Sequence, residues 1–257
     1  MKIIEVKNLS KIYYSSPKGR PRRAPAGGVE PYKNDGAETH ALRNISFDIE
    51  KGEYVAIMGP SGSGKSTLLH MLGFLDTATS GTYLFNGKSI DEYTSDEAAK
   101  IRNKEMGFIF QMFNLLPRTS VLDNVKLPLF YSDIDASKWD EMANDAIESV
   151  GMTYRINHEP SQLSGGEQQR AAISRALVLN PGVIFADEPT GNLDSKSGKM
   201  IMETLQHLHE DHGNTIILIT HETYTASHAT RVIRLLDGEI ESDKKVEHRL
   251  RAEKFKK

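Results

Sequence analysis

The segment GPSGSGKST, residues 59–67, lies between the apolar run YVAIM and the helix-like run LLHML. The spacing of Gly59, Gly64, Lys65 and Ser66 fits the pattern G-x-x-x-x-G-K-[ST] of a phosphate-binding loop. In such a loop the backbone N–H groups cradle phosphates, the lysine reaches the β- and γ-phosphates, and the hydroxyl group ligates Mg²⁺. A strand before the loop and a helix after it are the context that this motif requires, and a plain Gly/Ser turn does not need them. The segment therefore predicts a site for a nucleotide such as ATP with Mg²⁺.

Every residue of this segment is a candidate contact to the nucleotide. The candidates are Gly59, Pro60, Ser61, Gly62, Ser63, Gly64, Lys65, Ser66 and Thr67.

The composition indicates an ordinary globular protein. The chain has 257 residues, of which 38% are hydrophobic, enough for a normal core. No apolar run approaches the roughly 18 residues that cross a bilayer, and the N-terminus has no signal-peptide pattern, so we expect a cytoplasmic protein unless a partner recruits it. The net charge of −3 argues against nucleic acid as a partner, and the absence of cysteine excludes disulfides and thiolate metal sites.

Short, β-branched runs alternate with helix-length segments along the chain, which predicts an α/β fold with a largely parallel sheet. The expected strands cover residues 3–9, 40–49, 54–58, 107–110, 183–187, 215–220 and 231–236. The clearest helix is predicted over 137–150, beginning at a capping pattern of Ser137 and Asp140 and ending before Gly151. Asp237-Gly238 predicts a hairpin near the C-terminus.

Two stretches do not have the composition of a core. Residues 15–36 carry four prolines and four glycines, which indicates a flexible insertion between two strands. We expect a solvated loop there, with two alternatives: a basic membrane clamp or a cover over the adenine. Residues 243–257 form a tail rich in lysine and arginine.

Paired carboxylates end the buried run VIFADE, residues 183–188. Asp187 suits a role linked to Mg²⁺, and Glu188 is placed to polarise an attacking water. The alternative is that both are ordinary helix-start acids, which the phosphate-binding loop makes the weaker interpretation. A GTPase is disfavoured, because the chain has no Asn-Lys-x-Asp pattern for guanine.

A second glycine-containing segment, LSGGEQQR at 163–170, precedes another helix-like run. Ser164, Gly165 and Gly166 would lie at the helix N-terminus, a second place suited to an anion, with Glu167 in the first turn. One nucleotide hardly needs two such devices from one chain. In a symmetric dimer, the segment of one chain would close on the γ-phosphate held by its partner.

These segments, together with Gln111, the NLD at 192–194 and His221, resemble the ABC-type ATPase subunits in order and spacing. The resemblance implies a P-loop NTPase of ABC type over 1–242, with a mostly parallel core sheet, an antiparallel β-subdomain and a helical subdomain at 112–165. It implies that Glu188 is the catalytic base and that Gln111 contacts Mg²⁺ and the water.

The resemblance also implies roles for three further residues. His221 would grip the γ-phosphate, Asp194 would link the two sites of the dimer, and Tyr13 would stack on the adenine. Tyr14, or a purely structural role for Tyr13, is the alternative at that position.

The stretch after Gln111 resembles the subfamily that serves lipoprotein release, macrolide export and division-linked mechanotransmission. The resemblance implies a groove for a cytoplasmic helix of a transmembrane permease, and filling the helical core is the alternative for each apolar residue there. The candidates are Met112, Phe113, Leu115, Leu116 and Leu129.

We therefore expect an ATPase subunit that forms a homodimer on ATP and associates peripherally with a permease at the cytoplasmic face of the inner or plasma membrane. One alternative is a non-transporting mechanotransmission complex that regulates cell-wall enzymes. Another is a soluble ABC ATPase acting on nucleic acid or ribosomes, but its usual second nucleotide domain, long coiled coil or zinc cysteines do not occur here.

Overall fold

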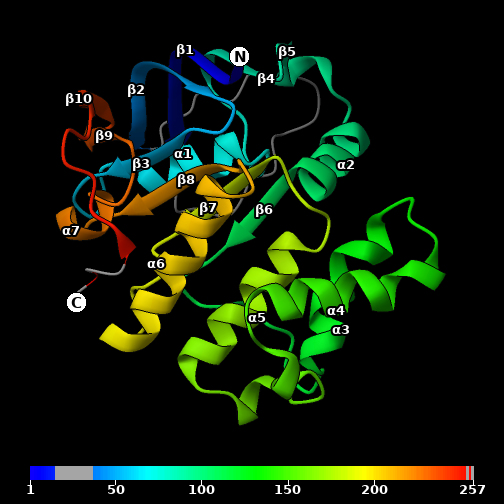
Figure 1. Cartoon of the computed structure of the whole chain (residues 1–257). Helices are drawn as coiled ribbons and strands as arrows, with labels where there is room; N and C mark the ends of the chain where they lie inside the picture. The colour runs from blue at the N-terminus through cyan, green and yellow to red at the C-terminus, as the bar shows by residue number, and fades with distance from the viewer. Residues whose placement is uncertain (15–36, 253–254, 256–257) are drawn as a thin grey trace, which may run out of the picture.

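The computed structural model describes residues 1–14, 37–252 and 255. Two β-sheets form the upper part of the molecule in Figure 1, and the helices α3, α4 and α5 form the lower part. The predicted insertion at 15–36 lies outside the described residues and connects β1 to β2, between two strands as expected.

The smaller sheet is antiparallel, with the strand order β2-β1-β4-β5. Its strands are β1 (Lys2–Tyr14), β2 (Glu38–Glu50), β4 (Ser80–Phe85) and β5 (Lys88–Ser89). Ile4 and Val6 of β1 are buried whereas Lys7 is exposed, so one face of this sheet packs on the core.

The larger sheet has the order β10-β9-β3-β8-β7-β6, and every neighbouring pair except β9 and β10 is parallel. Its strands are β3 (Tyr54–Met58), β6 (Met106–Ile109), β7 (Val183–Asp187), β8 (Thr215–Thr220), β9 (Arg231–Leu236) and β10 (Glu239–Lys245). The central strands read as continuous apolar runs because both of their faces are covered. The predicted α/β fold with a mostly parallel core sheet and a separate antiparallel sheet is confirmed.

Each face of the larger sheet belongs to its own core. On one face, Ile57 and Ile219 pack with Leu68 of α1 (Lys65–Leu72) and with the antiparallel sheet. On the other, Leu218 packs with Leu205 of α6 (Ser195–Glu210) and with the helical part. The remaining elements beside the sheets are η1 (Ile90–Glu92), α2 (Ser95–Glu105) and α7 (Thr223–Ala226).

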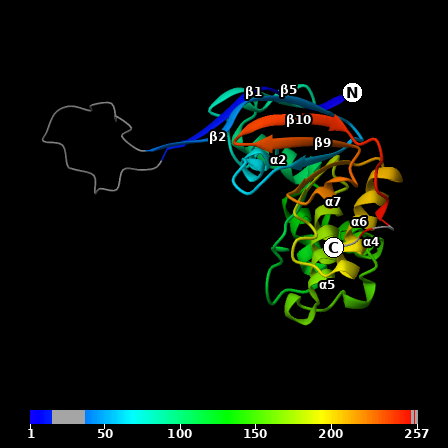
Figure 2. The same cartoon turned by 90° about the vertical axis from the view of Figure 1, so that its left-hand side faces the viewer.

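The helical part lies below the sheets in Figure 2, and it extends beyond the range 112–165 expected for a helical subdomain, because its last helix, α5, runs from Gly165 to Leu177. It consists of α3 (Val121–Lys126), η2 (Leu127–Tyr131), η3 (Ala136–Lys138), α4 (Trp139–Ser149), η4 (Thr153–Arg155), η5 (Pro160–Gln162) and α5 (Gly165–Leu177). The helix predicted over 137–150 is present as α4, but its start differs. Asp135 caps the preceding 3₁₀ turn through the N–H of Ser137, so Ser137 is not the cap. Gly151, with φ of 65°, follows the helix as predicted.

The C-terminal region contains the predicted hairpin, with Asp237 and Gly238 at φ of 48° and 83° between β9 and β10. The tail differs from the expectation that it stands apart from the core. β10 continues to Lys245, past the expected boundary at 242, and Phe255 is buried against Tyr224 and His228. The C-terminal segment packs on the core although it has few apolar residues, because a hydrogen bond also holds it there. Nε of Arg249 donates to the carbonyl of His228.

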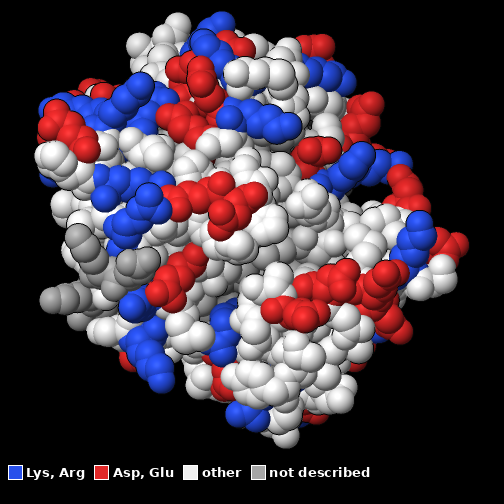
Figure 3. Space-filling view, viewed as in Figure 1, with Lys and Arg blue, Asp and Glu red and all other residues white. Residues whose placement is uncertain are grey.

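Charges of both signs are interspersed on the face shown in Figure 3, and acidic side chains gather over α4, whose sequence contains two Asp and two Glu. None of the helices in the described residues combines the length and the apolar character needed to cross a membrane.

Candidate functional site

A pocket of about 680 Å³ opens where β3, β7 and β8 end, the edge at which open α/β sheets bind ligands. It brings together most of the predicted site. The predicted residues that line it are Pro60, Ser61, Gly62, Gly64, Lys65, Ser66, Thr67, Gln111, Asp187, Glu188 and His221. Thr39, His40 and Ala41 of β2 complete the lining.

Two residues of the loop lie behind the pocket and shape it. Ser63 is 2% exposed, and its N–H donates to the carbonyl of Pro60. A Cβ at Gly59 would lie 2.3 Å from the carbonyl oxygen of Leu235, so only glycine fits there. Gly64 has φ of 99°, and a Cβ there would meet the carbonyl oxygen of Ala41 at 2.5 Å. The glycines are therefore needed for close backbone approach as well as for the turn.

Lys65 is held inside its own loop. Its Nζ donates to the carbonyl oxygens of Gly59 and Pro60, both at 2.8 Å. Burial lowers the pKa of Lys65, and the nearby Glu188 and Asp187 carboxylates oppose that shift. The ammonium group therefore lies at the pocket, partnered by carbonyls that a phosphate could replace.

The two predicted carboxylates have different surroundings. Asp187 ends β7, and burial, followed by the charge of Glu188, raises its pKa. Glu188 has a left-handed backbone, with φ of 46°, and its side chain is 16% exposed. Its Oε1 lies 2.6 Å from Nδ1 of His221, so the structure joins these two predicted residues directly.

Gln111 lies just beyond β6 and contacts Asn192, whose Nδ2 donates to the carbonyl of Gln111 at 3.0 Å. Together with Ser66 and Asp187 it offers one carboxylate, one amide and one hydroxyl to the same pocket. Mg²⁺ typically takes one or two carboxylates and completes its shell with phosphate oxygens and water, so these donors fit Mg²⁺ bound with a nucleotide. Within the described residues, no group of three or more His, Cys, Asp or Glu side chains could hold a metal.

Tyr13 lies beside the phosphate-binding loop, near the pocket. Its hydroxyl donates to Asp76 at 2.8 Å, and its strand partner is Thr39, which lines the pocket. Burial and the hydrogen bond to Asp76 raise the pKa of Tyr13, while a hydrogen bond with Thr67 opposes the shift. Tyr14 follows it on the strand, and successive side chains of a strand point to opposite faces, so the two tyrosines do not share these surroundings.

The segment at 163–170 lies elsewhere. None of its residues is among the described residues that line the pocket of the same chain. Ser164 caps α5, and Glu167 completes the capping box and accepts from Arg155 at 2.8 Å. The predicted nucleotide contact Glu167 therefore points its carboxylate toward its own helical part.

The glycines of this segment pack against the turn that contains Asp194. A Cβ at Gly166 would meet Oγ of Ser197 at 2.5 Å, and Gly165 lies near Leu193. Asp194 caps α6 by accepting from the N–H groups of Lys196 and Ser197, which lowers its pKa.

The apolar residues predicted to form a groove divide into two groups. Met112 and Leu116 are 73% and 46% exposed, and Phe113 and Leu115 are partly buried. Leu129 is fully buried, so its assignment to the groove was wrong: it fills the core of the helical part, which was the alternative.

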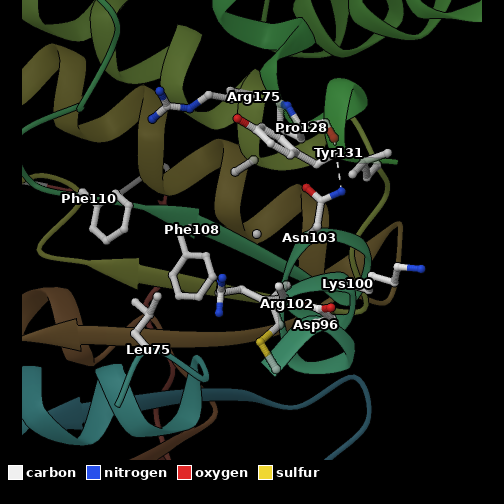
Figure 4. A pocket seen from close by; sticks show the side chains of 15 residues that line it. Leu75, Asp96, Lys100, Arg102, Asn103, Phe108, Phe110, Pro128, Tyr131 and Arg175 are labelled. Atoms are coloured by element: carbon white, nitrogen blue, oxygen red, sulfur yellow. Dashed lines mark hydrogen bonds between the residues drawn. The ribbon is translucent and has the colours of Figure 1, made fainter. Parts of the chain in front are cut away.

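A second pocket, of about 780 Å³, lies beside this stretch, between α2, β6, η2 and α5 (Figure 4). Phe108, Phe110 and Tyr131 give it apolar walls, and Lys100 and Arg102 lie at its rim. No motif in the sequence indicates this pocket. Most of its residues come from four elements that only the tertiary structure brings together, and nothing in the sequence marks them as neighbours.

Arg175 of α5 joins this second pocket to the stretch after Gln111. Its guanidinium donates to the carbonyl oxygens of Phe113 at 2.9 Å and Asn114 at 2.6 Å. Both of these residues have positive φ, of 54° and 51°. Burial lowers the pKa of Arg175.

Comparison with known proteins identifies the arrangement. The family described as "ABC transporter" matches residues 42–191. The macrolide export ATP-binding/permease protein MacB of Bdellovibrio bacteriovorus is 50% identical over 216 residues, which are 84% of this chain and 33% of the relative. The uncharacterized ABC transporter ATP-binding protein MJ1508 of Methanocaldococcus jannaschii is 48% identical over 238 residues, 93% of this chain and 97% of the relative. The chain thus spans about a third of the MacB relative and nearly all of the second protein.

A solved structure is similar over its full length. The dimeric, post-hydrolysis ATP-binding cassette MJ0796, bound to ADP and Pi, has a TM-score of 0.81 and 38% identity, and the match covers 95% of this chain and 99% of that one. The pocket geometry and these similarities agree. The chain belongs to the ABC transporter family, as an ATP-binding cassette with ATPase activity.

Proposed function

We propose that this cassette hydrolyses ATP as a homodimer in which each nucleotide lies between the phosphate-binding loop of one chain and the Ser164 segment of the other. One observation carries the proposal: the pocket that holds Lys65, Glu188 and His221 receives nothing from the Ser164 segment of its own chain. The first N–H groups of α5 have no partner within the helix, as at any helix start, and suit an anion supplied by a second chain. The related cassette MJ0796 is dimeric with ADP and Pi, which supports the same arrangement here.

Within the pocket, each residue has a task that follows from its chemistry. The loop amides and the N-terminus of α1 bind the phosphates, and Lys65 exchanges its carbonyl partners for phosphate oxygens. Glu188 accepts a proton from the attacking water, and His221 orients Glu188 through Nδ1. Ser66, Gln111 and Asp187 would hold Mg²⁺, which supplies charge neutralisation at the phosphates.

We further propose that the dimer drives a separate transmembrane permease from the cytoplasmic face of the membrane. MJ1508, named as an ATP-binding protein, matches this chain over nearly its whole length, and MacB is named as both ATP-binding and permease protein. The second pocket is the docking place we assign to a cytoplasmic helix of the permease, because its apolar walls suit the apolar face of such a helix. Arg175 would couple a helix bound in this pocket to the stretch after Gln111, because its guanidinium donates to the carbonyls of Phe113 and Asn114.

The name of the MacB relatives favours export as the process that is driven. A drug, a lipoprotein or a peptide would be the transported substrate. Export agrees with the subfamily that the sequence resembles. Only the names of the MacB relatives favour export over the non-transporting alternative.

A complementation experiment tests the shared site. Ser164→Arg disrupts the Ser164 segment and leaves the nucleotide pocket intact. Lys65→Ala disrupts the nucleotide pocket and leaves the Ser164 segment intact. Each variant alone is expected to be inactive, and an equimolar mixture should recover about a quarter of the wild-type rate, because half of the dimers are mixed and each has one complete site. A mixture no more active than its parts would contradict the shared site.

A further inference from the structure

Glu167, in the first turn of α5, is held by donors on both of its carboxylate oxygens. Oε2 accepts from the N–H and from Oγ of Ser164, both at 2.8 Å. Oε1 accepts from Nε of Arg155 at 2.8 Å and from the hydroxyl of Tyr154 at 3.1 Å. The Glu167 side chain is 12% exposed, so this carboxylate is nearly enclosed, and it is paired with one guanidinium.

The turn that supplies Arg155 is fixed in place. Arg155 also contacts Nε2 of His158 at 3.0 Å, and the carbonyls of Ile156 and His158 accept from the first N–H groups of α3. The pKa of Glu167 falls to about 2, first through the Ser164 N–H and then through Arg155. Glu167 is therefore anionic at any physiological pH, and Arg155, not a proton, neutralises it.

The single hydroxyl proton of Ser164 is committed to Glu167 in this arrangement. In the shared-site dimer proposed above, on which this inference rests, the same hydroxyl faces the γ-phosphate of the partner's ATP. Two difficulties then arise: an unpaired carboxylate would repel the phosphate, and it would keep the hydroxyl proton for itself.

We propose that Arg155, assisted by Tyr154, is a positioning residue for ATP hydrolysis. By neutralising Glu167 it allows Ser164 to turn its hydroxyl proton from the carboxylate to the γ-phosphate of the partner's ATP. When the proton turns away, Glu167 keeps the Ser164 N–H, Arg155 and Tyr154 as donors and is not left unsatisfied. No bond is made or broken in this step; only one hydrogen bond changes its acceptor.

A structural role for Arg155 would have different consequences, and a substitution of Glu167 separates the two. Glutamine at the third position of a capping box supports the cap as glutamate does, but it carries no charge to neutralise. If Arg155 acts on the charge of Glu167, its removal should matter only while that position holds a carboxylate. If Arg155 only braces the turn, its removal should cost the same with either side chain.

The experiment is a double-mutant cycle on the full chain with Arg155→Ala, Glu167→Gln and the combined variant. We expect Arg155→Ala to lower kcat about tenfold, as the loss of one partner from an enclosed charge pair does, with ATP binding to the monomer unchanged. The combined variant should be as active as Glu167→Gln alone, and Arg155→Lys should recover part of the rate. In a Glu188→Gln background, Arg155→Ala should raise the ATP concentration needed for half-maximal dimerisation, measured by light scattering after size exclusion.

Arg251→Ala is the matched control, because Arg251 makes a 2.8 Å pair with Glu210 on α6, and it should leave both readouts unchanged. Tyr154→Phe removes one donor to Glu167, and with it the 3.4 Å contact of the Tyr154 hydroxyl with Nη2 of Arg170, while the Arg155 guanidinium stays in place. The part of its smaller loss that acts through Glu167 should also vanish in the Glu167→Gln background, which keeps the cycle informative if Arg155→Ala folds poorly. An equal cost of Arg155→Ala in both backgrounds overturns the proposal. Failure of the shared site itself would appear differently, as a wild-type chain that does not dimerise on ATP and variants that do not complement.

Discussion

Nδ1 of His221 lies 2.6 Å from Oε1 of Glu188, and the two residues follow neighbouring parallel strands, β8 and β7. A proton on Nδ1 makes His221 a donor that fixes the orientation of the carboxylate. Glu188 also has positive φ although it is not glycine, a strained backbone that recurs at functional sites. This geometry supports the proposal that Glu188 acts as a base and that His221 orients it.

Glu188→Gln is expected to lower ATP turnover at least about a hundredfold, because an amide cannot take the proton from water. ATP binding should remain, since the loop and Lys65 are untouched, and the variant should accumulate as an ATP-bound dimer. Turnover is measured by phosphate release. Glu203→Gln, on the exposed surface of α6, is the control, and hydrolysis by Glu188→Gln at a similar rate to this control would refute the role of Glu188.

His221→Ala should lower turnover by about tenfold or more, because Glu188 loses its orienting donor. Combined with Glu188→Gln it should cost nothing further, since the group that His221 orients is already gone. Independent, multiplicative losses measured in single-turnover experiments would show that His221 acts on the phosphate without Glu188.

Tyr13→Ala is expected to weaken equilibrium ATP binding about fivefold or more, the usual loss when a base loses its aromatic platform. Tyr13→Phe keeps the ring and loses only the hydrogen bonds of its hydroxyl with Asp76 and Thr67, so it should bind nearly as well as the wild type. Tyr14→Ala is the matched control on the neighbouring position. A larger loss for Tyr14→Ala would move the stacking role to that residue.

Tyr131→Glu tests the second pocket, which this 79% exposed ring lines. A charge on the apolar wall should abolish the stimulation of ATPase activity by the permease while leaving the basal rate of the isolated cassette unchanged. Phe130→Glu is the control, because the neighbouring ring packs on Trp139 and does not line the pocket. Equal effects of both variants would count against this pocket as the docking place.

Much of the nucleotide pocket could be predicted because its residues sit at motif positions on strand ends. The glycine spacing around Lys65 and the acids after a buried strand each have a local meaning, and parallel strands then bring Asp187 and His221 to one edge. The contribution of Thr39–Ala41 was not visible, since β2 reaches the loop only through the packing of the two sheets.

Other differences arise where tertiary contacts override a local pattern. Leu129 looked like any other apolar residue of its stretch, and only the packing of α3 and α4 shows that it is buried. Asp135 and Ser137 are both good capping residues, so the sequence pattern does not decide between them. Asp135 is the cap because a 3₁₀ turn begins directly after it, before α4. The pair of Arg155 and Glu167 joins residues twelve apart through a turn that has no periodicity to reveal it.

The packing of the C-terminal segment on α6 can be tested by measuring stability. Phe255 is 6% exposed, and a Cβ at Gly198 of α6 would lie 2.8 Å from its Cε1 atom. Phe255→Ala should lower the free energy of unfolding by about 2–3 kcal/mol, near the lower end for a buried aromatic ring because the site is close to the chain end.

Gly198→Ala is then expected to destabilise the wild type but to stabilise the Phe255→Ala variant. In the wild type the new methyl group collides with the Phe255 ring and should destabilise the protein, although alanine is the better helix former. In the Phe255→Ala background the collision is absent, and the same substitution should stabilise α6 by up to about 1 kcal/mol. Urea unfolding of the four proteins measures both effects. A stabilising Gly198→Ala in the wild type would mean that Phe255 does not pack on α6 in solution, and the tail would then stand apart from the core as its composition suggests.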